Sequence, residues 1–105
     1  MSAPGTPHVR FIIVHTPGPK WVSGLDFREQ PGVEDHVKHY RAVHEAGQLQ
    51  LGGPFLMPDS GGMMIPIDGL TEDQVCQIAE SDPAVKSGLL HAKVRPWYIA
   101  MSLVP

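Results

Sequence analysis

The order of hydrophobic and polar positions predicts strand, helix, strand, strand, helix and strand along this 105-residue chain. A run of β-branched and aromatic residues at 8–15 predicts a buried first strand, and the segment 48–55 alternates as a half-buried strand does. A turn rich in Pro and Gly separates this segment from a third strand at 62–67, which predicts a hairpin. The last strand is expected over 91–104, with an interruption at Pro96.

The predicted element order is that of a ferredoxin-like α+β sheet, βαββαβ, with both main helices on one face. A chain of 105 residues, 42% hydrophobic and 18% charged, predicts a single domain over 1–105 with a modest core. Residues 1–7 are rich in Pro, Gly and Ser and are expected to form a flexible arm.

Local capping signals fix the second main helix, expected over 70–81. Thr71 is a preferred N-cap residue and Gln74 follows three residues later, which together predict a capping box. The helix ends at the step from Asp82 to Pro83, because the residue before a proline is disfavoured in the α region. Pro83 then suits the first position of a short helical turn that has Asp82 as its N-cap.

The first helix, expected from near Pro31 to a stop at Gly47, carries three of the six histidines. At about 100° per residue, three apolar or aromatic residues lie within about 60° of His36 on the helix: Val33, Tyr40 and Val43. His36 therefore lies inside the apolar stripe. Because such a stripe normally faces the core, an imidazole in its middle needs a polar partner or a pocket.

Two irregular regions are expected beside this helix. The segment 16–32 is rich in Gly and Pro but contains Trp21 and Phe27, which predicts a cover that folds back over apolar groups. Gly52 and Gly53 have no side chain to pack, so they indicate a bulge or a close approach of a ligand or another backbone.

Charge and hydropathy exclude several classes of partner. The net charge is −3 and no basic run occurs, so no nucleic-acid partner is expected. No apolar run approaches the roughly 20 residues that span a bilayer, so no membrane segment is expected. A single cysteine, Cys76, excludes an internal disulfide framework and fits a reducing compartment. We therefore expect a cytoplasmic protein.

The predicted sheet leaves one of its faces without helices. In so small a domain, this face and the excess of methionines are best buried by a second copy of the chain, which predicts a homodimer or a higher homo-oligomer. The methionines concerned are Met57, Met63, Met64 and Met101.

A resemblance to the YCII-related family of dimeric α/β-barrel proteins is carried by four segments: HVKHYRAVHEAGQLQLGGPF (36–55), GGM (61–63), SDPAVKSGLL (81–90) and VRPW (94–97). The resemblance extends over roughly residues 8–101 and implies a ferredoxin-like fold. In this family the proposed active site pairs a histidine at the start of the first helix with the aspartate of an Asp-Pro step. By position these are His36 and Asp82. Relatives include an enzyme that eliminates HCl from a chlorinated hydroxyquinol.

The resemblance implies a cofactor-independent lyase, dehydrochlorinase or isomerase that acts on a small aromatic or quinol-like compound. His36 would be the general base, and Asp82 would set its tautomer and stabilise the imidazolium. Six residues are expected to bind the substrate: His39, Tyr40, Gly53, Pro54, Phe55 and Trp21.

Metal and cofactor chemistry have no support in the sequence. His36 and His39 form an HxxH pair, but no further ligand follows at a suitable spacing, so no metal is expected. Because no GxGxxG or P-loop is present, neither a dinucleotide nor ATP is implied.

Two non-catalytic interpretations remain open. Asp82 could serve only as the N-cap of the Pro83 turn, with His36 as a hydrogen-bonded core histidine. The whole domain could then be a small-molecule-binding or assembly module on the same dimeric fold.

Overall fold

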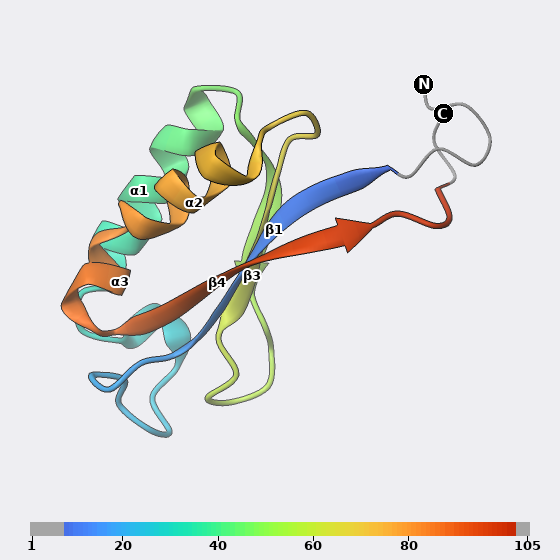
Figure 1. The fold of residues 1–105 in the computed structure, drawn as a ribbon. Coiled ribbons are helices and arrows are strands. Elements are labelled where there is room, and N and C mark those ends of the chain that lie inside the picture. The colour runs from blue at the N-terminus through green and yellow to red at the C-terminus, as the bar shows by residue number, and fades with distance from the viewer. Residues whose placement is uncertain (1–7, 103–105) are drawn as a thin grey trace.

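A four-stranded antiparallel sheet carries all three α-helices of the described residues on one face (Figure 1). The structure is a computed structural model that describes residues 8–102, so the predicted arm at 1–7 lies outside the described residues. The elements are β1 (Val9–Pro17), η1 (Phe27–Glu29), α1 (Val33–Glu45), β2 (Leu49–Pro54), β3 (Gly62–Pro66), α2 (Glu72–Glu80), α3 (Pro83–Ser87) and β4 (Leu90–Tyr98). The strand order β2-β3-β1-β4 confirms the predicted ferredoxin-like α+β fold.

The register of β1 determines which side chains face the helices. Ile13 lies opposite Met64 of β3 and Val94 of β4, and all three pack in the core beneath the helices. Because strand side chains alternate between the two faces, His15 points to the same side as Ile13. The first strand therefore delivers a histidine into the space between sheet and helices.

Helix α1 begins at Val33, two positions later than predicted, because Gly32 has a left-handed backbone with φ of 90°. The helix ends as predicted by the glycine signal, with Gly47 at φ 77°. The Gly47 N–H donates to the carbonyl of His44, and the Gln48 N–H donates to that of Val43. These two bonds form a Schellman motif, which turns the chain from α1 into β2.

The predicted capping box of α2 is confirmed. The Thr71 hydroxyl accepts from the Gln74 N–H at 3.2 Å, and the Gln74 side chain accepts from the Thr71 N–H at 2.8 Å. Helix α3 also begins as predicted, with the Asp82 carboxylate accepting from the Ala84 N–H at 2.9 Å. Local sequence signals thus position the aspartate at the N-terminus of α3.

The prolines in the sheet have different consequences. Pro96 was expected to interrupt the last strand, but β4 continues through it from Leu90 to Tyr98. This is possible because β4 is an edge strand that pairs only with β1, so its outer side needs no N–H donor. Pro66 ends β3 opposite a register shift between Leu49 and Leu51 in β2, as expected for a proline beside a bulge.

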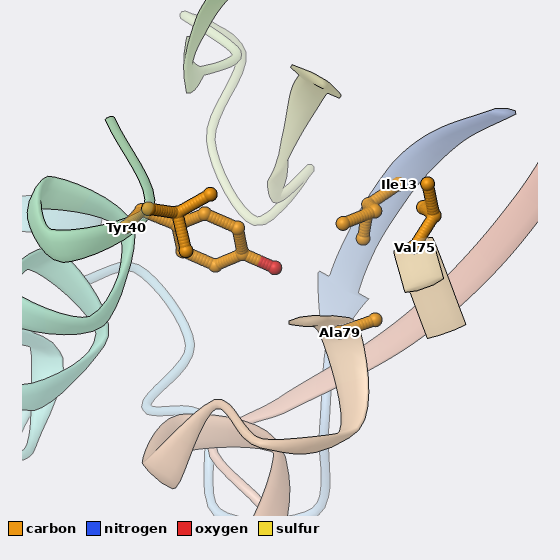
Figure 2. Close-up of a cluster of buried hydrophobic side chains, with 5 residues drawn as sticks. Ile13, Tyr40, Val75 and Ala79 are labelled. Atoms are coloured by element: carbon orange, nitrogen blue, oxygen red, sulfur yellow. The ribbon is translucent and has the colours of Figure 1, made fainter. Parts of the chain in front are cut away.

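Two apolar clusters stabilise the domain. The first contains Ile13, Tyr40, Val43, Val75 and Ala79 and lies between the sheet and helices α1 and α2 (Figure 2). The second contains Val33, Ala84, Leu89 and Leu90 and is covered by Trp21 and Phe27. The segment 16–32 is therefore a cover over apolar groups, as its two aromatic residues predict.

The face of the sheet opposite the helices carries apolar side chains as well. By alternation from Ile13, this face presents Met63, whereas Met64 points into the core. Trp97 of β4 and Leu51 of β2 belong to the same open face and are 42% and 54% exposed. Within residues 8–102, no helix is both long and apolar enough to cross a bilayer.

Candidate functional site

A buried hydrogen bond joins the first turn of α1 to the N-terminus of α3. His36 Nδ1 lies 2.6 Å from Asp82 Oδ2. The two residues are 4% and 0% exposed, so the pair is almost fully removed from water. The contact expected between these residues is present, and it provides the polar partner that an imidazole in an apolar helix stripe requires.

Asp82 uses its two carboxylate oxygens for different tasks. Oδ1 accepts from the Ala84 N–H at 2.9 Å and thereby caps α3, while Oδ2 accepts from His36. Burial alone would raise the pKa of Asp82, but the hydrogen bond and charge of His36 and the Ala84 N–H together hold it below its ordinary value. The capping role and the role as partner of His36 therefore coexist, and Asp82 remains a carboxylate at neutral pH.

A third residue of this cluster, His15, was not among the site residues predicted from the sequence. It is 1% exposed, and its Nε2 lies 3.8 Å from Asp82 Oδ2 and 3.5 Å from the Tyr40 hydroxyl. Its ring contacts that of His36 edge-on, with 5.0 Å between centroids. The alternation of β1, which places residue 15 on the same face as Ile13, is the sequence signal that could have identified it.

Burial controls the charge of this cluster. Burial lowers the pKa of His15 to about 4, with a further contribution from the charge of His36. Burial also raises the pKa of Tyr40, and the nearby Asp82 carboxylate acts in the same direction. At neutral pH, His15 is therefore a neutral imidazole and Tyr40 a neutral phenol, and the negative charge of the cluster resides on Asp82.

A cavity of about 690 Å³ opens beside this cluster, between α1 and the hairpin of β2 and β3. His15, His36 and Tyr40 line it, whereas Asp82 lies outside the lining. The remaining wall is largely apolar and includes Val33, Val37, Phe27 and Met64. This volume and lining fit a small ring-shaped molecule with a few polar atoms.

Three of the residues expected to bind substrate line this cavity: Tyr40, Gly53 and Pro54. A side chain at Gly53 would have no heavy atom within 4 Å of its Cβ, but because Gly53 pairs with Met63, this Cβ would point to the helix-free face of the sheet. The neighbouring Gly52 differs, because a Cβ at that position would lie 2.3 Å from the sulfur of Met64. Gly52 is thus a packing position, and Gly53 is a lining residue of the cavity.

The other three residues expected to bind substrate lie elsewhere. Trp21 covers the second apolar cluster, and its indole N–H donates to Asp59 at 2.8 Å. Phe55 follows β2 at the hairpin turn and is 41% exposed. His39 Nε2 donates to the Ile78 carbonyl at 2.7 Å, which turns its ring toward α2. None of the three lines the cavity, because hydrogen bonds to distant residues hold Trp21 and His39 elsewhere and Phe55 lies at the exposed hairpin turn.

Within residues 8–102, one group of side chains could hold a metal ion, and it differs from the HxxH pair considered above. The ligating atoms of His15, His36 and Asp82 all lie within 4.8 Å of one another. However, two ligands on one tetrahedral zinc ion are about 3.3 Å apart, whereas His36 and Asp82 are in direct contact at 2.6 Å. The observed geometry is that of a hydrogen-bonded pair, and an ion would have to replace this bond.

The arrangement is suited to proton transfer at one nitrogen. Because the Asp82 carboxylate can only accept, Nδ1 of His36 carries the proton of the 2.6 Å bond. In the neutral form of the ring, His36 Nε2 has a free lone pair, and His36 lines the cavity. A neutral imidazole oriented by a carboxylate can accept a proton at Nε2, and the carboxylate stabilises the resulting imidazolium.

Comparison with known proteins agrees with this fold. A solved structure of 5-chloro-2-hydroxyhydroquinone dehydrochlorinase from Burkholderia phenoliruptrix, in complex with 2,5-dihydroxybenzoquinone, matches with a TM-score of 0.50 and 20% identity. The match covers 83% of this chain and 92% of the other. No curated protein matches the sequence. The sequence model of the YCII-related domain matches residues 9–98. The chain therefore belongs to the YCII-related domain family.

Proposed function

We propose that this protein is a cofactor-independent acid–base enzyme of the lyase or isomerase type, acting on a small aromatic or quinol-like compound. The observation that carries the proposal is the buried 2.6 Å contact between His36 Nδ1 and Asp82 Oδ2, which leaves Nε2 of a cavity-lining imidazole free. His36 is the proposed general base. Asp82, outside the cavity lining, is the proposed positioning residue.

The proposed reaction begins with transfer of a substrate proton to His36 Nε2. The electron pair left on the substrate then forms a new double bond. In an elimination, a leaving group such as chloride departs with its bonding electrons, and His36 later returns its proton to water. In an isomerisation, His36 returns the proton to another atom of the same substrate. Both routes need only a base whose protonated form is stabilised. The Asp82 carboxylate supplies this stabilisation to the His36 imidazolium.

Two further observations support a ring-shaped substrate. The cavity wall beside His36 is formed largely by apolar groups, and the ring centroids of Phe27 and His36 are 5.7 Å apart. The dehydrochlorinase of similar fold is named for a chlorinated hydroxyhydroquinone and was solved with a dihydroxybenzoquinone.

The single cysteine of the chain, which fits a reducing compartment, supports our expectation of a cytoplasmic enzyme.

The test is turnover of a panel of chlorinated and unchlorinated hydroxyquinols by the wild-type protein and by His36→Ala. We expect at least one compound to be converted, and we expect the substitution to lower kcat/KM by about 10²- to 10⁴-fold, the range of general acid–base catalysis. His91→Ala is the matched control, because His91 is an exposed histidine of β4 outside the cavity lining. Equal activity of both variants would contradict the proposal.

The alternative function is a small-molecule-binding or assembly module without catalysis. It is favoured by one observation, the use of Asp82 Oδ1 as the N-cap of α3, which gives this buried aspartate a structural task. In that case, ring compounds would bind but none would be converted. His36→Ala would then lower stability, and the wild-type protein would leave the whole panel unchanged.

A further inference from the structure

The hydroxyl of Tyr40 has an unusual position for a tyrosine of the core. The residue is 3% exposed, its ring packs in the first apolar cluster, and Figure 2 shows the side chain reaching from α1 with its hydroxyl directed toward β1. Among the described residues, its only hydrogen-bond partner is His15 Nε2, at 3.5 Å. Tyr40 and His15 both line the cavity, so the contact between them belongs to the cavity wall.

The surroundings of His15 indicate which of its nitrogens carries the proton. Nε2 faces two oxygen atoms, the Tyr40 hydroxyl at 3.5 Å and Asp82 Oδ2 at 3.8 Å. A carboxylate oxygen only accepts, so a lone pair on Nε2 would face the negative charge of Asp82 without compensation. We therefore assign the proton of the neutral ring to Nε2.

This tautomer determines the direction of the Tyr40 hydroxyl. If His15 Nε2–H donates toward the Tyr40 oxygen, the phenol proton cannot point at His15 and must point elsewhere. No second partner accepts it among the described residues. A buried hydroxyl donor without an acceptor is costly, unless a molecule in the adjacent cavity supplies the acceptor.

We infer that Tyr40 donates a hydrogen bond to an oxygen atom of the bound molecule, and that His15 is the positioning residue that fixes this direction. The inference rests on the proposed function, since it concerns the ligand of the same cavity. The ligand class is a small ring that bears a phenolate, hydroxyl or quinone oxygen. Because the rings of Tyr40 and His36 are 5.2 Å apart, both groups reach the same end of such a ring.

The charge state of the cluster agrees with this role. Burial lowers the pKa of His15 to about 4, so a second positive charge does not form beside His36 when His36 takes up a proton. Burial raises the pKa of Tyr40, which therefore keeps its proton and remains a donor. Neutral, preoriented donors of this kind stabilise negative charge that develops on a substrate oxygen.

The experiment measures the Kd of 2,5-dihydroxybenzoquinone by calorimetry for the wild-type protein and four variants. Tyr40→Phe keeps the ring and removes the hydroxyl, so we expect binding to weaken about tenfold. Tyr98→Phe is the matched control, because Tyr98 is the other tyrosine of the chain and is 58% exposed at the end of β4. It should bind as the wild type does.

The remaining two variants test whether His15 acts through Tyr40. His15→Gln keeps an N–H donor near the position of Nε2 and should retain most of the affinity. Adding His15→Leu to Tyr40→Phe should weaken binding no further than Tyr40→Phe alone, because no hydroxyl is left to orient. A merely structural role of His15 would instead add its own loss in the double variant.

A ligand-free measurement keeps the inference testable if the His15→Leu variant does not fold. The ¹⁵N shifts of His15 in the wild-type protein should identify Nε2 as the protonated nitrogen, and protonation at Nδ1 would overturn the assignment. Unchanged Kd in Tyr40→Phe, or no binding by the wild-type protein, would overturn the inference. The proposed function is judged separately by turnover in His36→Ala, which can fail while the Tyr40 effect on Kd persists.

Discussion

Helices α1 and α2 pack on the same face of the sheet but use their inward sides differently. The buried residues of α2 are Val75 and Ala79, both apolar. Those of α1 are Val33, His36, Tyr40 and Val43, so two side chains with polar atoms lie within an otherwise apolar stripe. In this fold, one helix contributes to packing alone, while the other contributes to packing and also presents polar atoms to a cavity.

The difference follows from what each helix faces. Helix α2 lies against β1 and β4, where apolar contacts with Ile13 fill the space. Helix α1 lies across from the β2–β3 hairpin, where the cavity opens, and its first turn meets Asp82 of α3. Polar side chains are accommodated on α1 because Asp82 accepts from His36 and because Tyr40 reaches His15 at the cavity wall.

The largest expected effect separates the two helices by activity and stability. His36→Ala on α1 should lower kcat about 10³-fold, and it should also lower the free energy of unfolding, because it leaves the buried Asp82 carboxylate without its partner. Val75→Ala on α2 should cost about 2 kcal/mol of unfolding free energy, because it leaves a cavity in the core, and should leave kcat unchanged. Urea unfolding and steady-state kinetics on both variants provide the comparison, which fails if the two profiles coincide.

The second effect is the dependence of stability on pH that His15 introduces. The pKa of His15 falls from an ordinary 6.5 to about 4 in the folded protein, so between these values the unfolded chain binds a proton that the folded chain does not. The contribution of neutral His15 to the free energy of unfolding is therefore fully present above pH 6.5. It is lost as the pH falls toward 4, by about 3 kcal/mol at most.

His15→Gln should remove this part of the decline. Urea midpoints measured from pH 7 to 4 should have a shallower slope for His15→Gln than for the wild type. His91→Gln, at an exposed histidine, should keep the wild-type slope. The low pKa of Asp82 acts in a more acidic window, below about 3.8, and should remain in both variants. Parallel curves for wild type and His15→Gln would contradict the account of the buried cluster.

The third effect concerns the face of the sheet that neither helix covers. We expect a homodimer through this face, with a mass in light scattering of twice the chain mass of 11.4 kDa. Trp97→Lys places a charge on this face and should raise the dimer dissociation constant at least about tenfold. Glu80→Lys on the exposed side of α2 is the control. A monomer at micromolar concentration for the wild type would contradict this prediction.

The smallest expected effect is that of metal removal, which should change nothing. We expect purified protein to carry no stoichiometric transition metal, because His36 and Asp82 are bonded directly to each other. Dialysis against a chelator should leave kcat and the urea midpoint unchanged. Stoichiometric zinc that is retained by the wild type and lost in His36→Ala would make the cluster of His15, His36 and Asp82 a metal site instead.

Features that depend on neighbouring residues could be predicted from the sequence. The capping box of Thr71 and Gln74 and the N-cap at Asp82 are readable because both partners lie within three residues. The element order led to the fold, and the family resemblance identified Asp82 as the partner of His36 across 46 positions.

Features that depend on distant partners were missed. His15 becomes significant only when β1 brings it against residues 36 and 82, so it resembled any buried residue of a strand. Trp21 and His39 had the right chemistry for a cavity, but Asp59 and the Ile78 carbonyl hold them elsewhere. A strand pattern gives the face on which a side chain lies, whereas its partners on that face are set by tertiary packing.

The most direct test of the central claim is a double-mutant cycle in kcat/KM on His36→Ala and Asp82→Asn, with whichever panel compound is converted. Asparagine caps a helix about as well as aspartate, so the cap of α3 is kept while the charge and acceptor for His36 are changed. If the pair acts as one unit, each single variant should lose about 10²-fold or more, and the double variant should lose little beyond His36→Ala alone. Losses that simply multiply, or full activity in Asp82→Asn, would contradict the claim.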